Sequence, residues 1–466
     1  MNRAFGCIPP SCAAPLFILP CAHYHACMTH PPKVILRRCD EYDVQALRAI
    51  ISEGMAELGF APRGRTLIKP NVVFAHPRYS QYAYTEPRFV EAGVYALRDA
   101  GAQNLEIGES GGMGVPGRML FKTAGYYDMG RRAGVPVLDF NEQPWVRAPL
   151  SKGVVHKSFL AAKCLANADT KVWMPKLKYH ITTTITQTLK LNIGILTHKE
   201  RMIGHTEKLH EKIVDLLEGG YPDLIISDGI TIGHGFESCA RPHHLGLVLM
   251  SNHPLSSDVV AAHILGFDPH AVKHLVIAHE RGYGSLELGD IDITGDITIP
   301  ELQERTHGIF SDFSDLQRVD SPMKFYEGVA AGTDIVCDGG CATAVKGALG
   351  VIDAHTPGSL KTARAGAVVT GIYDGDVIHP GEPVFLIGDC TRVLGKIEAS
   401  KVVRRKGCPS ITRDILFLMP GLFSLPNPAL DLNDGVRFAR EFATRAAVRT
   451  LTRAKHSMSK TDSSPK

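Results

Sequence analysis

The sequence predicts an α/β fold: a mostly parallel sheet covered by helices, followed by a second, smaller α/β domain towards the C-terminus. From residue 33 onwards, short apolar stretches of strand length alternate with longer stretches of helical periodicity. This order favours parallel strands with helices on both faces. The chain also has 466 residues, and single hydrophobic cores rarely grow beyond about 250–300 residues. We therefore expect two folded domains.

The first domain begins with a regular alternation of elements. Strands are expected where apolar residues run together or alternate, and helices where they recur every three to four positions. The expected strands are 33–39, 65–73, 104–110, 135–140, 169–175, 223–230 and 245–252. The expected helices are 41–58, 86–101, 118–133, 183–196, 206–218, 256–265 and 270–281.

The pattern loosens between about 284 and 325, and a second α/β unit follows. Its expected strands are 333–340, 367–376 and 382–390, and its expected helices are 341–352, 392–400 and 411–419. The expected parts of the chain are a leader at 1–27, an α/β domain with a ligand crevice at 28–300, a smaller cysteine-bearing α/β domain at 325–435, and a basic disordered tail at 440–466.

The first 27 residues hold four cysteines and four prolines but only one arginine. The prolines divide the apolar stretch that a signal peptide would need, and an arginine-poor segment is not typical of organelle targeting. We therefore interpret this stretch as a non-native or disordered leader and expect the native chain to start at Met28.

The bulk composition is that of a soluble globular protein, with 44% hydrophobic and 21% charged residues. A net charge of +3 gives no reason to expect a nucleic acid or an anionic membrane as a partner. Without the leader, seven widely spaced cysteines remain, an odd number that does not resemble a secreted disulfide framework. The expected location is the cytoplasm.

The stretch MPKLKYHITTTITQTLKLNIGIL, residues 174–196, carries polar groups inside an apolar segment. A helix from Thr183 to Leu196 would have one apolar and one polar face, as a helix on the outside of a sheet also would. However, Pro175 ends the preceding strand, so the segment leaves the sheet at a carboxyl end, where α/β folds bind ligands. Together with the lysines, this position predicts a cationic pocket for a carboxylate or phosphate.

Charged and polar residues also follow neighbouring expected strands. Lys69 and Asn71 end one strand, Glu109 and Ser110 end another, and Asp228 ends a third. Each could simply be solvated in a loop. Since the carboxyl ends of parallel strands meet at one edge of a sheet, their recurrence predicts a crevice there.

LIKPNVV, NLEIGES, MPKLKYHITTTITQTLKLNIG, HKERMIGH, DLIISDGI and SSDVVAAHILGFDP occur in this order. As a set they resemble the domain of unknown function 362 family over roughly residues 34–285. The resemblance implies an α/β domain, sometimes found in proteins that carry iron–sulfur clusters. Its polar motif positions are Lys69, Asn71, Glu109, Ser110, Lys176, Lys178, His180, Lys190, Asn192, His205 and Asp228. The chain departs from the family in GHGFES after the aspartate–glycine motif, and it lacks a block of closely spaced cysteines.

Four cysteines of the second unit fall at the ends of expected elements: Cys337, Cys341, Cys390 and Cys408. Strand ends could bring them together around a four-iron cluster or a zinc ion. One C-x-x-x-C pair with two isolated cysteines is weaker evidence than two C-x-x-C pairs. Buried or unpaired thiols therefore remain the alternative.

Two further motifs are weaker. His198 and His205 flank the lysine-rich segment and could bind a metal or act as acid–base groups. GMGVPG at 112–117 fits a dinucleotide fingerprint, with Asp139 about 22 residues later at the end of the next strand. Pro116 removes an N–H that could face phosphate, so NAD is the least favoured cofactor and a glycine loop over the crevice is preferred.

These observations predict an enzyme that binds a small anionic substrate or cofactor in a lysine and histidine crevice, with redox or lyase/isomerase chemistry. The expected catalytic residues are Lys178, Lys190, His180, Glu109 and Asp228. The expected ligand-binding residues are Lys69, Asn71, Ser110, Lys176, Asn192 and His205. The expected iron–sulfur or zinc ligands are Cys337, Cys341, Cys390 and Cys408, and a cluster would imply a redox partner. The alternatives are a non-catalytic metal or cluster carrier and a dinucleotide-dependent oxidoreductase.

Overall fold

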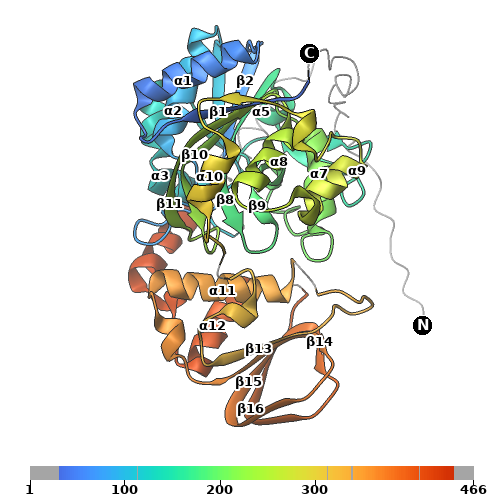
Figure 1. Cartoon of the computed structure of the whole chain (residues 1–466). Coiled ribbons are helices and arrows are strands. Elements are labelled where there is room, and N and C mark those ends of the chain that lie inside the picture. Colours follow the sequence, from blue (N-terminus) through green and yellow to red (C-terminus); the bar gives the residue numbers. More distant parts are fainter. Residues whose placement is uncertain (1–30, 113, 312, 337–338, 409, 445–466) are drawn as a thin grey trace, which may run out of the picture.

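The computed structural model describes residues 31–112, 114–311, 313–336, 339–408 and 410–444. A large sheet with helices on both faces forms one unit, and a smaller sheet with two long helices forms a second unit against it (Figure 1). This confirms the predicted fold class. Residues 1–30 and 445–466, which include the expected leader and most of the expected tail, lie outside the described parts.

Within the described residues, the large sheet has ten strands, in the order β12, β1, β11, β10, β7, β2, β3 and β4, with β8 and β9 branching from β10. Its strand pairs are parallel except β1–β11, β10–β11 and β8–β9. The strands are β1 Lys33–Arg38, β2 Arg65–Pro70, β3 Asn104–Glu109, β4 Val137–Asp139, β7 Thr170–Met174, β8 Lys176–His180, β9 Thr184–Thr186, β10 Leu224–His234, β11 Arg241–Ser251 and β12 Asp292–Gly295. A separate antiparallel pair consists of β5 Trp145–Pro149 and β6 Ser158–Ala162.

Helices cover both faces of this sheet. One face carries α1 Val44–Glu57, α2 Pro87–Asp99, α3 Gly117–Ala124 and α4 Tyr126–Ala133. The other face carries α7 Leu209–Gly219, α8 Pro254–Ile264, α9 Lys273–Glu280 and α10 Ile299–Thr306, with the short helices α5 Lys163–Ala166 and α6 Thr188–Leu191 nearby. Successive residues Leu67 and Ile68 of β2 enter the two different cores, as expected for a strand that is buried on both faces.

The smaller unit has a four-stranded parallel sheet in the order β13, β14, β15 and β16. Its elements are β13 Met323–Glu327, α11 Cys341–His355, β14 Gly366–Tyr373, β15 Val377–Val393, β16 Ile397–Arg405 and α12 Thr412–Phe423. Single 3-10 turns are η1 Asn192–Ile195, η2 Pro269–Ala271, η3 Leu288–Asp290, η4 Leu316–Arg318, η5 Ser359–Thr362 and η6 Pro428–Leu430. A further helix covers 432–444, so the first part of the expected tail is helical.

Two predicted helices are wrong. Residues 183–196 form β9, α6 and η1 instead of one helix. The start of this segment is a strand because it pairs with β8 in an antiparallel hairpin, in which Tyr179 lies opposite Ile185. Residues 392–400 end β15 and begin β16, where pairing with neighbouring strands overrides the local pattern. The expected strand at 333–340 is not formed in its described part.

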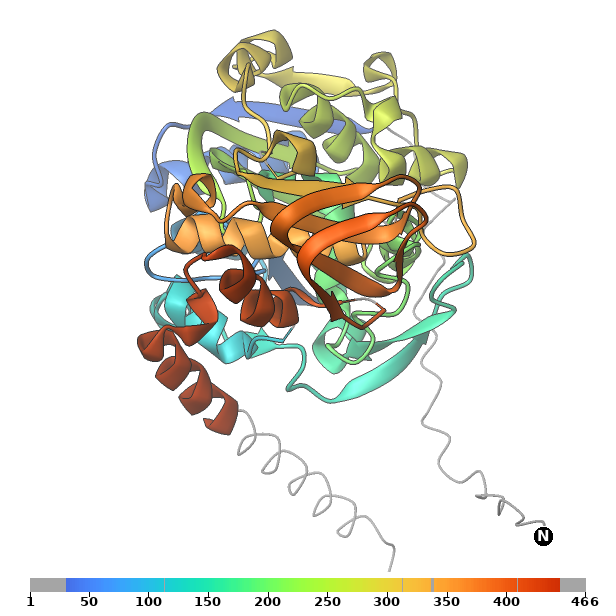
Figure 2. The same ribbon diagram turned by 90° about the horizontal axis from the view of Figure 1, so that it is seen from below.

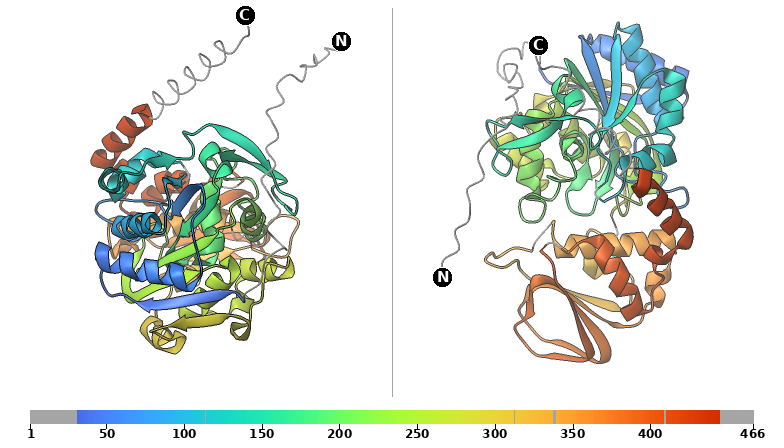
Figure 3. Two further views of the ribbon diagram at one scale, coloured as in Figure 1. Left: turned by 90° about the horizontal axis from the view of Figure 1, so that it is seen from above. Right: turned by 180° about the vertical axis from the view of Figure 1, so that it is seen from behind.

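Helix α11 faces the large unit (Figure 3). Ile181 and Phe236 of the large unit share a hydrophobic cluster with Val345 and Ala348 of α11. The hydroxyls of Thr182 and Thr343 are 2.9 Å apart across the same contact. The hairpin and the loop after β10 therefore lie directly under the smaller unit.

Close packing at this contact predicts opposite effects for two alanine substitutions. A Cβ on Gly350 in α11 would lie 2.6 Å from Cβ and Cγ of Phe236, whereas a Cβ on Gly421 in α12 meets nothing within 4 Å. Gly350→Ala should lower the free energy of unfolding by about 1–3 kcal/mol through overpacking. Gly421→Ala should raise it by about 0.5–1 kcal/mol by stiffening the helix. Urea unfolding of both variants tests this, and equal changes would contradict the packing.

Candidate functional site

Predicted site residues gather at the carboxyl edge of the large sheet. Lys69 ends β2, Glu109 ends β3, Lys176 and Lys178 lie on β8, and Asp228 lies on β10. The three lysines are at most 2% exposed. Burying an ammonium group is costly unless a carboxylate or several acceptors surround it, so the partners of each lysine determine what it can do.

Lys69 and Glu109 form a closed ion pair. Nζ of Lys69 donates to Oε2 of Glu109 over 2.6 Å, and the backbone N–H of Ser110 donates to Oε1 over 2.7 Å. Burial lowers the pKa of Lys69, and the carboxylate of Glu109 opposes that shift. Gly194 allows the η1 turn to approach, because a Cβ there would lie 2.3 Å from Oε1 of Glu109.

Lys176 and Asp228 form a second closed pair. Nζ of Lys176 donates to Oδ2 of Asp228 over 2.8 Å and lies 2.9 Å from the hydroxyl of Tyr42. Tyr42 also donates to Oδ1 of Asp228 over 2.8 Å, and the backbone N–H of Glu86 donates to Oδ2 over 3.0 Å. Burial, with Asp228 beside it, raises the pKa of Tyr42. This geometry joins three segments of the large unit.

Lys178 is held by neutral acceptors. Its Nζ donates to the carbonyls of Ala83 over 2.6 Å and Glu237 over 2.9 Å, and it lies 3.5 Å from Oδ1 of Asn71. Burial lowers the pKa of Lys178 to about 7; the charge of Glu237 opposes the shift and that of Lys190 adds to it. With each of its three protons directed at an acceptor, Lys178 has no donor left for a ligand.

Lys190 differs from these lysines. Among the described residues, the amine of Lys190 forms no hydrogen bond and no ion pair. Its side chain is partly exposed to solvent. Burial of the amine nonetheless lowers the pKa of Lys190 to about 8, with Glu237 opposing the shift and Arg201 adding to it. An amine whose pKa is lower than that of an ordinary lysine therefore lies among other charged groups.

Glu237 and His180 face this amine. Burial raises the pKa of Glu237, while Lys190 and Lys178 pull it down. Nε2 of His180 lies 3.6 Å from Oε1 of Glu237, and its Nδ1 accepts from the backbone N–H of Thr182 over 3.1 Å. An accepting Nδ1 places the proton of a neutral ring on Nε2. Burial, reinforced by Lys190 and Lys178, holds the pKa of His180 well below its usual value.

Other cations and histidines complete the surroundings. Arg201 donates to the carbonyls of Gly111 and Leu196, each over 3.1 Å, and to the hydroxyl of Ser110. Burial lowers the pKa of His205 and His274 well below the usual value, and Lys190 adds to both shifts. Both ring nitrogens of fully buried His274 lack a hydrogen-bond partner in the described structure.

Three residues of this site were not predicted from the sequence: Glu237, Arg201 and His274. Arg201 lies in HKERMIGH, which carried the family resemblance, and Glu237 lies in GHGFES, which was read only as a departure from the family. His274 has no local signal, because tertiary packing of α9 brings it near Lys190.

The remaining predicted residues have other contacts. Oδ1 of Asn192 accepts from Nε1 of Trp173 over 2.8 Å, on the side of η1 that packs against Gly220. The backbone N–H of His198 donates to Oδ1 of Asn141 over 2.8 Å. Gly117, which starts α3 after the glycine loop, lies so close to Asp139 that a Cβ would sit 2.4 Å from Oδ2.

Three of the four predicted metal ligands lie near one another. Burial raises the pKa of Cys408, and the charges of Cys341 and Cys390 raise it further. A Cβ on Gly388 would lie 2.8 Å from Sγ of Cys341. Cys337 lies outside the described residues, and within them no group of three or more histidines, cysteines or carboxylates is arranged to hold a metal ion. The metal site stays a prediction.

The cysteines adjoin the lysine site. The backbone N–H of Gly339, two residues before Cys341, donates to the carbonyl of Thr206 over 2.8 Å. A Cβ on Gly339 would lie 1.9 Å from the carbonyl oxygen of His205. The segment that carries His205 therefore connects the start of α11 to the surroundings of Lys190.

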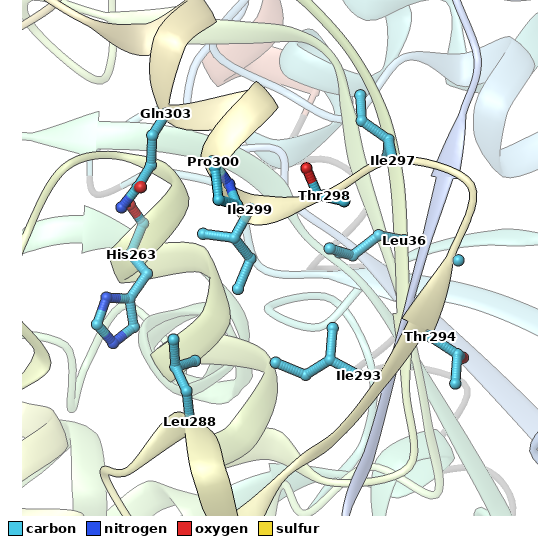
Figure 4. Close-up of a pocket in the computed structure, with 11 residues that line it drawn as sticks. Leu36, His263, Leu288, Ile293, Thr294, Ile297, Thr298, Ile299, Pro300 and Gln303 are labelled. Atoms are coloured by element: carbon cyan, nitrogen blue, oxygen red, sulfur yellow. The ribbon is translucent and has the colours of Figure 1, made fainter.

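A separate cavity of about 490 Å³ lies beside the edge strand β12. Figure 4 shows it lined mainly by apolar side chains, among them Leu36, Leu288 and Ile293. None of the lysines described above contributes to its walls.

The fold and site together define an α/β protein with a cluster of buried lysines at the carboxyl edge of its large sheet. Residues 66–263 match the model of the family named Domain of unknown function (DUF362), the family that the sequence motifs predicted. The thylakoid-associated protein sll1697 of Synechocystis sp. is 26% identical over 260 residues, which cover 53% of this chain and 78% of that protein. The lactate racemase apoprotein from Thermoanaerobacterium thermosaccharolyticum superposes with a TM-score of 0.34 and 10% identity, covering 72% of this chain and 68% of that one.

The energetic coupling of the buried Lys69–Glu109 ion pair can be tested by substitution. Lys69→Met leaves a buried carboxylate without its cation and should lower the free energy of unfolding by about 3–5 kcal/mol. Adding Glu109→Leu removes that charge and should recover most of the loss. Urea unfolding of the two variants tests the pair. A double variant no more stable than Lys69→Met would show that the two side chains are not coupled.

Proposed function

We propose that the protein is an enzyme that binds a small anionic substrate or cofactor in the crevice and uses Lys190 as its reactive group. The observation that carries the proposal is the unsatisfied amine of Lys190 in the described structure, with a pKa lowered to about 8. Lys69, Lys176 and Lys178 each donate to at least one protein acceptor. The amine of Lys190 has no such partner within the described structure, which leaves its donors for a ligand.

The charges around Lys190 favour an anion. The positive charge of Arg201 lowers the pKa of Lys190, and the positive charge of Lys190 lowers the pKa of Lys178. Burial keeps the nearby His180 neutral, because it holds the pKa of that ring well below its usual value. A ligand carboxylate or phosphate would pair with the protonated amine and replace the water lost on binding. An uncharged ligand would leave the positive charges of Lys190 and Arg201 balanced only by Glu237 and Glu109.

Lys190 and Glu237 can exchange roles as base and acid. Burial moves the pKa of the amine down and that of the carboxyl up, which brings both towards the pH range where general acid–base catalysis is effective. The neutral amine can take a proton from a bound substrate or attack a carbonyl carbon, while Glu237 gives or takes a proton opposite. His180, with its proton on Nε2, holds Glu237 in place.

We also propose that Cys341, Cys390 and Cys408, with Cys337, hold an iron–sulfur cluster or a zinc ion beside the crevice. The proximity of three thiols at element ends supports this. A cluster would supply electron transfer or Lewis acidity near the substrate. If the cysteines alone carry the function, the protein is a metal or cluster carrier, which is the second candidate.

The proposed location of this activity is the cytoplasm, supported by the separate, free thiols of the described cysteines. No helix in the described part of the chain is long and apolar enough to cross a bilayer.

Glyoxylate with cyanoborohydride tests the role of Lys190, because this small carboxylate aldehyde forms an imine with an accessible neutral amine, and reduction fixes it as a carboxymethyl group. Lys190 is neutral above its pKa, so labelling should rise through pH of about 8, whereas an ordinary surface lysine needs a pH near about 10.4. Peptide mass spectrometry measures the labelling. Acetate and oxalate should compete.

Lys190→Arg keeps the positive charge and should lose this labelling, while the matched surface variant Lys401→Arg should keep it. If Lys190 labels no faster than Lys401 across the pH range, or if competing anions have no effect, the proposed role of Lys190 fails.

Metal content tests the cysteine site. The chain purified without oxygen should contain iron with inorganic sulfide and show the broad visible absorbance of sulfur-to-iron charge transfer, or contain zinc without colour. Cys341→Ser and Cys390→Ser should remove the metal, and Cys164→Ser, far from the group, should not. A metal-free protein, or equal metal content in all three variants, would overturn the metal proposal and leave the lysine crevice untouched.

A further inference from the structure

The helix over 432–444 packs on the protein with its polar side. Oδ1 of Asp434 lies 2.9 Å from Nε2 of His76. Arg437 donates to the hydroxyl of Thr123, and Glu441 lies 4.0 Å from Nζ of Lys122. These contacts fix which side of the helix faces α3 and the loop after β2.

The opposite side of this helix is apolar and uncovered. Leu432 is 83% exposed, Val436 72% and Phe442 44%, and Ala439 and Ala443 between them are also exposed. These residues recur every three to four positions and form one stripe. A Cβ on Gly435, in the same stripe, would meet nothing within 4 Å. Figures 2 and 3 place the helix at the periphery of the molecule.

This orientation reverses the usual arrangement. Packing normally buries the apolar side of a surface helix because apolar area in water costs free energy. Here ion pairs and hydrogen bonds hold the polar side inwards, so the stripe stays available. A helix with its stripe turned to solvent needs a partner that can take up apolar side chains.

The charge of the sequence from this helix onwards indicates the kind of partner. From residue 437 to the end, the sequence holds eight lysines and arginines against two carboxylates, although the net charge of the whole chain is only +3. Arg440 is exposed beside the stripe. A second copy of this chain would bring the same positive charge to the contact and be repelled, whereas an anionic surface would be attracted.

We propose that the helix over 432–444 docks the protein on an anionic lipid bilayer, with Leu432, Val436 and Phe442 inserted among the lipids at the interface. An amphipathic helix with apolar residues on one side and basic residues beside them binds in the plane of such a surface. This departs from the expectation drawn from net charge alone, which averaged a local basic segment over a nearly neutral chain. The proposal does not depend on the function of Lys190.

Flotation of the full chain with vesicles tests this proposal. Binding is expected with vesicles of phosphatidylcholine and phosphatidylglycerol, much less with phosphatidylcholine alone, and it should weaken as salt rises. The double variant Leu432→Glu, Val436→Glu should lower the bound fraction by about tenfold or more, since it places charge in the interface. Arg440→Gln should lower the affinity about fivefold, from one basic residue at an anionic surface.

Control variants separate the outcomes. Val154→Glu and Ile378→Glu change apolar residues elsewhere that are 55% and 43% exposed, and they should bind as the parent does. Lys190→Arg should also bind normally, which keeps this test independent of the proposed function. Thermal unfolding checks that the helix variants remain folded.

Three results would overturn the proposal. The first is no flotation with either vesicle composition, and the second is equal flotation of the parent and the double variant. The third is a concentration-dependent dimer in sedimentation that the double variant abolishes without any vesicle binding, since it would assign the stripe to a second copy of the chain.

Discussion

The structure depends on how buried lysine ammonium groups are neutralised at the carboxyl edge of the large sheet. Lys69 and Lys176 each have a carboxylate within 2.8 Å. Lys178 has backbone carbonyls instead, as has Lys212, which donates to the carbonyl of Ile203 over 2.8 Å. Desolvation of an unpaired ammonium would cost several kcal/mol (about 3–5 when one partner is removed). The strand ends, the hairpin and the turn at 192–195 must therefore keep their present positions.

This constraint separates the lysines that hold the fold from Lys190, for which we propose a reactive role. A lysine with a full set of acceptors is fixed in place and offers nothing to a ligand. Lys190 has no such set among the described residues, and its pKa is lowered to about 8 by burial. The satisfied pairs also set the potential at Lys190, since Arg201 and Glu109 act on its amine in opposite directions. Structural and reactive groups thus form one electrostatic unit.

Many residues at this edge could be predicted from the sequence. Polar residues that directly follow apolar parallel strands lie together, because the carboxyl ends of such strands are at the same edge of the sheet. Lys69, Glu109 and Asp228 are examples. The local conformation of 183–196 could not be predicted, because its helical spacing is overridden by the pairing of Tyr179 with Ile185. Glu237 reaches the site through the turn between β10 and β11, and His274 reaches it through a distant helix. No spacing along the chain reveals such contacts. The predicted roles of the site residues and cysteines remain predictions.

The chain after η6 returns from the smaller unit to the larger one and ties them together. Asp431 binds Arg78 of the large unit over 2.6 Å and His355 of α11 over 3.4 Å. The hydrogen bond from Arg78 lowers the pKa of Asp431 to about 2, so the carboxylate stays ionised at any physiological pH. Because α11 also lies over the hairpin that carries His180, this clamp limits how far the smaller unit can move from the crevice. Under the proposed function, a ligand would reach Lys190 through local movement of loops rather than through separation of the two units.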